Sequence, residues 1–324
     1  MALEIYHHRS IHQAMLADQV RNQAFADALH HCVGPNDVVL DVGAGSAVLS
    51  LMAAQAGARR VYAIERSPAA AAWAEANTRA WGSRIQILQG DVAEVAVPEP
   101  VDVIVSEWLG AFGIDENLVS MALIARDRWL LPGGRMLPAR VTALAAPVED
   151  MQRLTRPMFD AAAIGGTPLR WAAAGLPAHH LLASPQPMWC TEIATFTVQQ
   201  AGLPFRAAPR WQALRSGRLE GLVAWFDADF GEGTHLVNAP GTVGESGTHW
   251  GQFVFALRSP IDVKAGQLIG AEITVIPAAP GYCHHAWSVR VQSGAWQHHD
   301  TRGAWLKATQ SPPLAATGSP LPMA

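Results

Sequence analysis

The segment 37–50 joins an apolar stretch, a glycine-rich turn and the start of a second apolar stretch. Residues 38–42 predict a buried parallel strand. Gly43 and Gly45 predict a turn whose backbone can approach a ligand closely, because neither residue carries a Cβ. The segment after the turn predicts a helix whose first amides are free to bind an anion. Such a strand–turn–helix unit is typical of an open α/β sheet and constrains the first part of the chain to that class.

A second apolar strand over 61–64 ends in Glu65, which is placed to accept hydrogen bonds from both hydroxyls of a ribose. Nicotinamide-binding and S-adenosylmethionine-binding domains share this arrangement. The dinucleotide fingerprint requires Gly or Ala where this chain has Val48. Asp91 and Val92 follow a third predicted strand and are candidate adenine contacts. The cofactor is therefore predicted to be S-adenosyl-L-methionine in preference to NAD.

Two carboxylates, Glu107 and Glu116, lie in one loop directly after the apolar strand 101–105. The carboxyl end of such a strand is where open α/β sheets place their ligand chemistry. Two acids held close together repel each other, and a planar guanidinium bridging them removes the conflict. A solvated helix-capping pair is the alternative, but Trp108 and other apolar neighbours favour a shaped, partly dry loop. The loop is predicted to bind a guanidinium.

Composition sets the outer limits. The chain has 324 residues, half of them hydrophobic, which is enough for two domains. Its formal charge of −4 predicts neither a nucleic-acid partner nor a charged membrane surface. We find no signal peptide and no membrane-spanning apolar run. The three isolated cysteines predict no disulfide framework, and without supporting ligand spacing the histidine doublets predict no metal site. A cytoplasmic location is expected.

Several segments resemble motifs of the protein arginine N-methyltransferase family, and the resemblance runs through most of the chain. They are the cofactor-covering helix at 11–21, the glycine motif at 41–45, the ribose-binding strand end at 62–65, the double-glutamate loop at 106–116 and the Thr-His-Trp loop at 248–250. Five such motifs in the family's order form a specific signal. The chain is similar to a short, bacterial-type, type I-like member.

The resemblance implies an α/β plus all-β fold, with a Rossmann-like class I methyltransferase domain followed by a β-barrel domain with an inserted dimerisation arm. Alternating runs after residue 141, such as 192–198, 221–227 and 252–257, favour strands in the second part. The predicted boundaries are N-terminal helices over the cofactor at 1–33, the cofactor domain at 34–140, the β-barrel at 141–310 with the arm at 158–187, and a disordered tail at 311–324.

The resemblance also assigns roles to individual residues. Glu107 and Glu116 correspond to the catalytic pair, and His249 with Asp18 to a pair that either takes up the released proton or locks the N-terminal helix. The residues matched to the acceptor are Tyr6, Met15, Trp108 and Trp250. The residues matched to the cofactor are His12, Arg21, Asp41, Gly43, Ala44, Gly45, Glu65, Asp91 and Val92.

Some positions depart from the family pattern. Ala47 replaces the last glycine of the glycine motif, Leu118 stands where many members have methionine, and the segment before Tyr6 is short. These departures leave the product type open. The acceptor is predicted to be an arginine in a protein or peptide, or free arginine, and the chain is predicted to form a homodimer. A catalytically inactive interaction protein is the alternative, and Val48 opposes a nicotinamide-dependent oxidoreductase.

Overall fold

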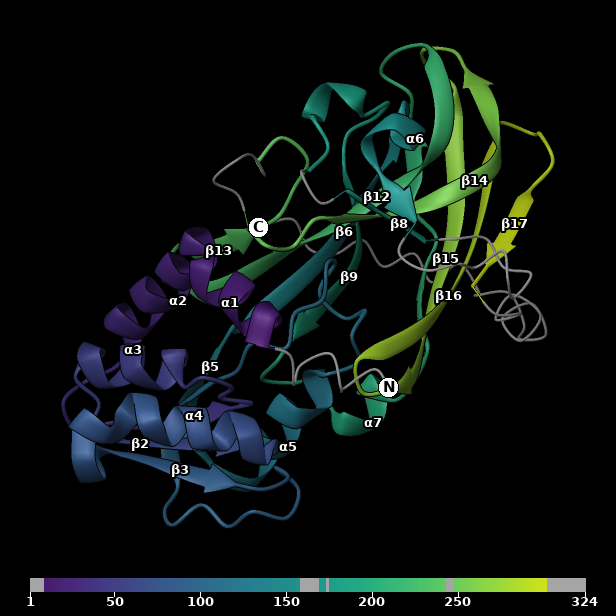
Figure 1. Cartoon of the computed structure of the whole chain (residues 1–324). Helices are drawn as coiled ribbons and strands as arrows, with labels where there is room; N and C mark the ends of the chain where they lie inside the picture. The colour runs from purple at the N-terminus through teal and green to yellow at the C-terminus, as the bar shows by residue number, and fades with distance from the viewer. Residues whose placement is uncertain (1–8, 158–168, 173–174, 243–247, 302–324) are drawn as a thin grey trace.

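The computed structural model describes residues 9–157, 169–172, 175–242 and 248–301, with only the backbone given for 9–12, 157 and 169. Figure 1 shows two parts: helices around a parallel sheet in the first half of the chain, and long antiparallel strands in the second. Tyr6, the His12 side chain, much of the predicted arm and the predicted tail at 311–324 lie outside the described residues.

The first part is built on a parallel sheet of five strands in the order β3-β2-β1-β4-β5. The chain turns from one side of β1 to the other between β3 and β4, so a crevice opens at the carboxyl ends of β1 and β4. Helix α3 packs on β1 and β2, α4 on β2 and β3, and α5 on β4 and β5. The elements are β1 (Val38–Val42), α3 (Val48–Ala56), β2 (Arg60–Glu65), α4 (Pro68–Thr78), the 3₁₀ helix η2 (Arg79–Arg84), β3 (Ile85–Gln89), β4 (Val101–Val105), α5 (Val119–Trp129) and β5 (Leu130–Leu137).

The N-terminal segment forms two helices, and the cofactor-covering helix predicted at 11–21 is interrupted at Asp18. Helix α1 (Arg9–Ala17) ends before Asp18, and α2 (Gln19–Cys32) begins after it. Asp18 has extended backbone angles, and its side chain accepts a hydrogen bond from the amide of Arg21. Aspartate is among the strongest N-cap residues, so it begins a new helix here. Helix α2 then packs against α3.

The second part consists of two antiparallel sheets. The indole Nε1 of Trp287 in one sheet donates to the carbonyl of Ala256 in the other at 3.0 Å, so the sheets are tied through their core. One sheet contains β6 (Arg140–Val148), β7 (Arg156–Pro157), β8 (Leu169–Ala172), β9 (Gln186–Glu192), β12 (Gly217–Gly231), β13 (Thr234–Val237) and β14 (Gln252–Val263). The other contains β10 (Phe205–Ala207), β11 (Arg210–Gln212), β15 (Leu268–Ala279), β16 (Tyr282–Val291) and β17 (Gln297–Asp300).

The strand predicted over 192–198 is wrong. Strand β9 ends at Glu192, and the chain then turns into the short helix α7 (Val198–Ala201). Thr197 and Gln200 form a reciprocal capping box at the start of α7. The Thr-x-x-Gln spacing supplies partners for helix amides, and this outweighs the alternating pattern of the same residues.

The dimerisation arm predicted over 158–187 is described only in part. Residues 169–172 form β8, which pairs with β14. Further along, the 3₁₀ helix η4 spans Ala178–His180, and β9 begins at Gln186. Leu176 and Leu182 are buried in the β-domain core. The described part of this range is thus integrated into the sheet, and the remainder lies outside the described residues.

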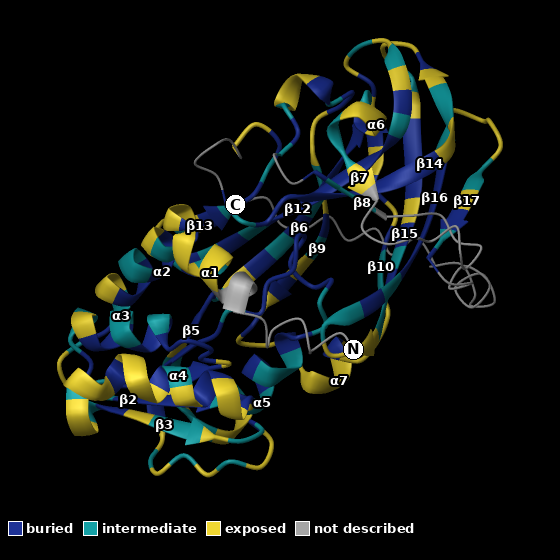
Figure 2. Ribbon diagram, in the orientation of Figure 1, coloured by how far each residue is buried: buried dark blue, intermediate teal, exposed yellow. Residues whose placement is uncertain are grey.

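The two parts share a continuous hydrophobic core. Figure 2 shows buried residues along the strands of both sheet systems and exposed residues along the outer helices. At the junction, Phe112 from the loop after β4 packs against Phe253, Phe255 and His285 of the β-domain, with ring centroids 5.4, 5.7 and 5.9 Å away. In the described ranges, no helix has the length and apolar character needed to cross a membrane.

Candidate active site

A cavity of about 700 Å³ lies between the parallel sheet and the β-domain. Its walls come from α1 and α2, from the loops after β1, β2, β3 and β4, and from β8 and β14. The cavity therefore opens where the strand order reverses, the position expected for a ligand in an open α/β sheet. The predicted site residues that line it are Met15, Arg21, Gly43, Ala44, Gly45, Glu65, Asp91, Val92, Glu107, Glu116, His249 and Trp250.

The glycine-rich turn leads from β1 into α3 at one end of this cavity. Gly43 and Gly45 have positive φ angles of 76° and 55°. A Cβ on Gly43 would meet nothing within 4 Å, so its backbone conformation and not crowding favours glycine there. Ala47, with φ 65°, adopts the left-handed conformation without being glycine. The turn leaves open space beside the first amides of α3, where a ligand can approach.

Glu65 stands at the carboxyl end of β2 and is held by two backbone donors. The amide of Gly45 donates to its Oε2 at 2.8 Å, and the amide of Ser67 donates to its Oε1 at 2.7 Å. Each carboxylate oxygen keeps a further lone pair for a ligand. Asp91 and Val92 line the same part of the cavity from the loop after β3.

Asp41 has a different place from the one predicted. It lies beneath the glycine turn, is 1% exposed, and does not line the cavity. Its Oδ2 accepts a hydrogen bond of 2.6 Å from the hydroxyl of Ser50 in α3. Burial raises the pKa of this carboxyl to about 6. The structure does not support direct contact with a cofactor, and Asp41 instead links β1 to α3.

Arg21 and Glu107 face each other across the cavity wall. Arg21 Nη2 lies 3.5 Å from Glu107 Oε2, and the two side chains are 4% and 10% exposed. The Oε1 of Glu107 accepts from the amide of Leu109 at 2.8 Å. The Nε of Arg21 is buried and has no hydrogen-bond partner within the described ranges. A buried donor in this state is costly, and an anionic ligand group in the cavity would satisfy it.

The loop that carries both glutamates is folded around Asp115, which sequence reasoning missed. Its carboxylate accepts hydrogen bonds from the amides of Ala111 at 3.1 Å and Phe112 at 2.9 Å. Gly110 lies directly against it, because a Cβ on Gly110 would overlap with the carboxylate. Burial raises the pKa of Asp115 to about 6. The acid therefore supports the loop from inside, next to Glu116.

Glu116 lines the cavity and is anchored through its main chain. Its carbonyl accepts a hydrogen bond of 2.6 Å from the amide of Gly281, in the turn between β15 and β16. Asn117 follows with a positive φ of 53°, a conformation that asparagine tolerates better than most residues. The second glutamate is thus positioned by the β-domain, whereas Glu107 is positioned by the parallel sheet.

Asp18 and His249 are paired, although they are 231 positions apart in the chain. His249 Nδ1 lies 2.7 Å from Asp18 Oδ2, and the His249 amide donates to the same oxygen at 2.7 Å. Burial alone would raise the pKa of Asp18, but the hydrogen bonds from His249 and Arg21 outweigh it and lower the pKa. The pair ties the start of α2 to the loop before β14, and His249 lines the cavity.

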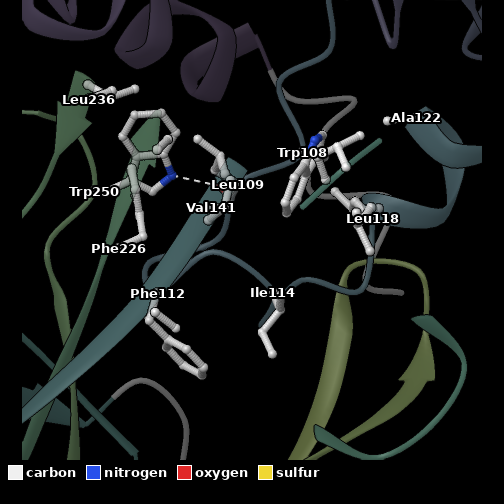
Figure 3. Close-up of a cluster of buried hydrophobic side chains, with 14 of the residues drawn as sticks. Trp108, Leu109, Phe112, Ile114, Leu118, Ala122, Val141, Phe226, Leu236 and Trp250 are labelled. Atoms are coloured by element: carbon white, nitrogen blue, oxygen red, sulfur yellow. Dashed lines mark hydrogen bonds between the residues drawn. The ribbon is translucent and has the colours of Figure 1, made fainter. Parts of the chain in front are cut away.

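The two tryptophans predicted to contact the acceptor lie in different surroundings. Trp250 lines the cavity, and its Nε1 donates to the carbonyl of Leu109 at 2.9 Å. Figure 3 shows this bond and the buried side chains around it. Trp108 is 2% exposed and lies in the core beside Leu118 and Ala122 (Figure 3). It does not line the cavity, so the structure does not support the prediction that it contacts the acceptor.

Asn238 is a second residue that sequence reasoning missed. Its side chain is fully buried and donates to the carbonyls of Ala111 at 2.8 Å and Gly251 at 2.9 Å. Its Oδ1 accepts from the amide of Phe226 at 2.9 Å. One side-chain amide thus joins the double-glutamate loop to β12 and to the residue before β14. An asparagine after a strand normally indicates a turn, so nothing in the sequence signals this role.

The residues in the cavity fit S-adenosylmethionine. The glycine turn provides space, Glu65 provides acceptors for ribose hydroxyls, and Arg21 has a buried donor suited to a carboxylate. In the described part of the chain, no group of three or more His, Cys, Asp or Glu side chains is arranged to hold a metal ion. A parallel sheet with these features at its switch point defines a class I methyltransferase domain.

The comparisons identify the family. Residues 39–134 match the family described as "Methyltransferase domain", and residues 158–290 match the "Arginine methyltransferase oligomerization subdomain". The chain is 33% identical over 285 residues to protein arginine N-methyltransferase 8-B of Danio rerio, covering 84% of this chain and 68% of that protein. It is 31% identical over 286 residues to protein arginine N-methyltransferase 1 of Schizosaccharomyces pombe, covering 84% of each.

The chain belongs to the protein arginine N-methyltransferase family. The predicted family, fold class, cofactor and S-adenosylmethionine-dependent arginine methyltransferase activity are thereby confirmed. The chain is similar to the crystal structure of Arabidopsis thaliana protein arginine methyltransferase 10, with a TM-score of 0.78 and 25% identity over 92% of this chain and 99% of that one. It is also similar to a Trypanosoma brucei enzyme–prozyme heterotetramer with AdoHcy, with a TM-score of 0.76, 26% identity and the same coverage.

Proposed function

We propose that Glu107 and Glu116 together hold the guanidinium of an arginine acceptor and present one of its nitrogens to the cofactor side of the cavity. The observation that carries this proposal is that both glutamates line the cavity also lined by the glycine turn and Glu65. The acceptor is an arginine in a protein or peptide, or a small guanidino compound. S-adenosylmethionine, when bound, supplies an electrophilic methyl group.

The two carboxylates act on the charge and the position of the guanidinium. A guanidinium has a pKa above 12 and carries its positive charge over three nitrogens. Carboxylates at two of its edges attract that charge away from the remaining nitrogen and fix the orientation of the plane. Alignment of reacting groups can contribute roughly 7–11 kcal/mol at best. In the structure Glu107 is paired with Arg21, so this pairing loosens when the acceptor takes its place.

Residue roles on the cofactor side follow from the same cavity. Glu65 would hold the ribose, Arg21 the amino-acid carboxylate, and Asp91 with Val92 the adenine. Asp18 and His249 act chiefly as a lock that keeps the start of α2 over the cofactor. The Asp18 oxygens are used by the cap of α2 and by His249, which supports this structural role.

Replacement of either glutamate by glutamine tests the proposal. We expect Glu107→Gln and Glu116→Gln each to lower kcat/KM for methyl transfer by about 100- to 1,000-fold, the range found when a transition-state contact is removed. Binding of S-adenosylhomocysteine, measured by calorimetry, should persist in Glu116→Gln. Glu272→Gln, an exposed residue of β15, is the matched control. Wild-type turnover in both cavity variants would refute the proposal.

We also propose that the chain forms a homodimer and works in the cytoplasm. The match of residues 158–290 to an oligomerization subdomain supports the dimer. Light scattering at micromolar concentration should give twice the chain mass, and a monomer mass would contradict it. Cys32, Cys190 and Cys283 are all unpaired, which suits a reducing compartment. Recovery of the native protein in a secreted fraction would contradict the location.

A further inference from the structure

Three side chains form a row across neighbouring strands at one edge of the β-domain. Strands β7, β8 and β14 are adjacent in the sheet, as Figure 2 shows. Phe253 in β14 is paired with Trp171 in β8, and Trp171 is paired with Arg156 in β7. Residues directly opposite each other in antiparallel strands point to the same face. Phe253, Trp171 and Arg156, here called the outer row, therefore share one face of the sheet.

The outer row leads from the cavity to solvent. Phe253 and Trp171 line the cavity together with both glutamates. Phe253 is 8% exposed, Trp171 is half-buried, and Arg156 is exposed. The outer row begins beside Glu107 and Glu116, which are proposed to bind the guanidinium, and ends at the positively charged Arg156.

The position of Trp171 is built into the fold. An added Cβ on Gly251 would overlap with the indole Nε1 of Trp171, so glycine makes room for the ring. The guanidinium carbon of Arg156 lies 4.7 Å from the ring centroid, as in a cation–π contact. Within the described ranges, no carboxylate forms an ion pair with Arg156. No described acid therefore neutralises its charge.

We propose that the outer row is a subsite for the far end of the acceptor, and that this end carries a carboxylate bound by Arg156. The acceptor is then a small guanidino acid, of which free L-arginine is the simplest. This inference rests on the proposed function, since it assumes that the guanidinium lies between Glu107 and Glu116. Phe253 and Trp171 would cover the aliphatic part of the acceptor, and Arg156 would pair with its carboxylate by the fork geometry that suits this group.

A small acceptor brings its own carboxylate to the outer row. Arg156 lies on the strand next to β8, and its guanidinium carbon is 4.7 Å from the ring of Trp171, which lines the cavity. The carboxylate of free arginine is joined to its guanidinium through one side chain, so a single molecule can present both charges. A peptide acceptor without acidic groups would bring no carboxylate to Arg156.

Paired acceptors test the subsite. Initial rates of methyl transfer are measured with L-arginine, with agmatine (the same molecule without its carboxylate), and with arginine peptides blocked at both ends, with and without a neighbouring glutamate. For the wild type we expect kcat/KM for L-arginine to exceed that for agmatine about 10- to 100-fold, the contribution of a charge-assisted hydrogen bond. In Arg156→Ala this ratio should fall below about threefold. Arg156→Lys keeps the charge but loses the fork, and should give an intermediate ratio.

The control is Arg153→Ala, which removes a nearby exposed arginine that pairs with Asp150 and lies outside the row. It should keep the wild-type ratio. Calorimetry with L-arginine and agmatine in the presence of S-adenosylhomocysteine provides a readout that does not depend on turnover. The same discrimination is expected in binding, and melting temperatures show whether each variant folds.

Each outcome separates the two proposals. If the wild type uses L-arginine and agmatine equally, or if the ratio is unchanged in Arg156→Ala, the proposed subsite is refuted. The proposal that Glu107 and Glu116 bind the guanidinium is then unaffected. Preference for the blocked neutral peptide over L-arginine also overturns the subsite. A glutamate-dependent preference among peptides, with no preference for L-arginine, retains carboxylate binding by Arg156 but replaces the small acceptor by a peptide. Failure to methylate or bind any of these acceptors removes the proposed function itself.

Discussion

Several acids lie at or near the cavity, and the local environment of each acid indicates a different role. Glu107 faces a buried arginine, so its charge is balanced before any acceptor arrives. Asp18 receives hydrogen bonds from two backbone amides and from a histidine ring, which favour its ionised form. Asp41 and Asp115 are also buried, and desolvation raises the pKa of each to about 6. The first two acids pair with side chains of other elements, whereas the last two support the backbone behind them.

Asp18→Ala distinguishes a lock from a proton acceptor. The change removes the cap of α2, which contributes about 1 kcal/mol, and the link to His249. Because Arg21 lies in the first turn of α2, we expect the Kd for S-adenosylhomocysteine to rise about tenfold. Asp18→Asn keeps an acceptor for the cap, and its Kd for S-adenosylhomocysteine should lie between those of the wild type and Asp18→Ala. Calorimetry gives both values, with Asp27→Ala in the same helix as the control. An unchanged Kd together with a large loss of kcat would instead identify a proton acceptor.

At the scale of elements, local patterns predicted much of the first domain. The strands at 38–42, 61–64 and 101–105 are apolar runs bounded by turn residues, and they occur as β1, β2 and β4. Where a helix-capping residue lies within an apolar periodic segment, the periodicity alone did not predict the correct element. Asp18 interrupts the helix predicted at 11–21, and the capping box at Thr197 replaces a predicted strand by α7. Strong caps at specific positions outweighed periodicity in both cases.

Site residues could be predicted from the sequence only where they belong to a short local motif. Cavity residues from the glycine turn, the ribose acid and the glutamate loop stand in short, spaced segments. Asn238, Trp171 and Phe253 depend on pairing between strands far apart in the chain. No local pattern distinguishes a buried asparagine that binds Ala111 from one in an ordinary turn. Trp171 reaches the cavity because β8 pairs with β14, within a range that the sequence assigned to an arm.

At the scale of the whole molecule, the two domains meet around Phe112 and His285. His285 is 4% exposed, lies among Phe112, Phe253 and Phe255, and neither of its ring nitrogens has a hydrogen-bond partner among the described residues. Burial lowers its pKa to about 3, and the nearby His284 adds to the effect. The ring is therefore neutral in the folded protein at any pH above this value. Protonation would place an unpaired charge in the aromatic junction that positions the glutamate loop.

This neutral histidine predicts a loss of stability in acid. Its pKa is about 6.5 when unfolded and about 3 when folded, so its contribution is fully present above pH 6.5 and falls as the pH drops toward 3. At pH 5 the loss amounts to about 2 kcal/mol. Asp41 and Asp115 act in the opposite direction, because their raised pKa values give stability below 3.8 that is lost as the pH rises through 6.

A comparison of variants isolates the histidine from these acids. His285→Leu keeps an apolar side chain of similar size in the junction and cannot be protonated. The free energy of unfolding is measured in urea for the variant and the wild type. The variant's value minus the wild-type value should be larger at pH 5 than at pH 8 by about 2 kcal/mol, because only the wild type loses stability in acid. His30→Ala, which removes an exposed histidine of α2, is measured at both pH values as the control for loss of a histidine outside the junction. If the His285→Leu difference is also the same at both, the folded protein tolerates a charged ring at the junction, and acid sensitivity must arise outside it.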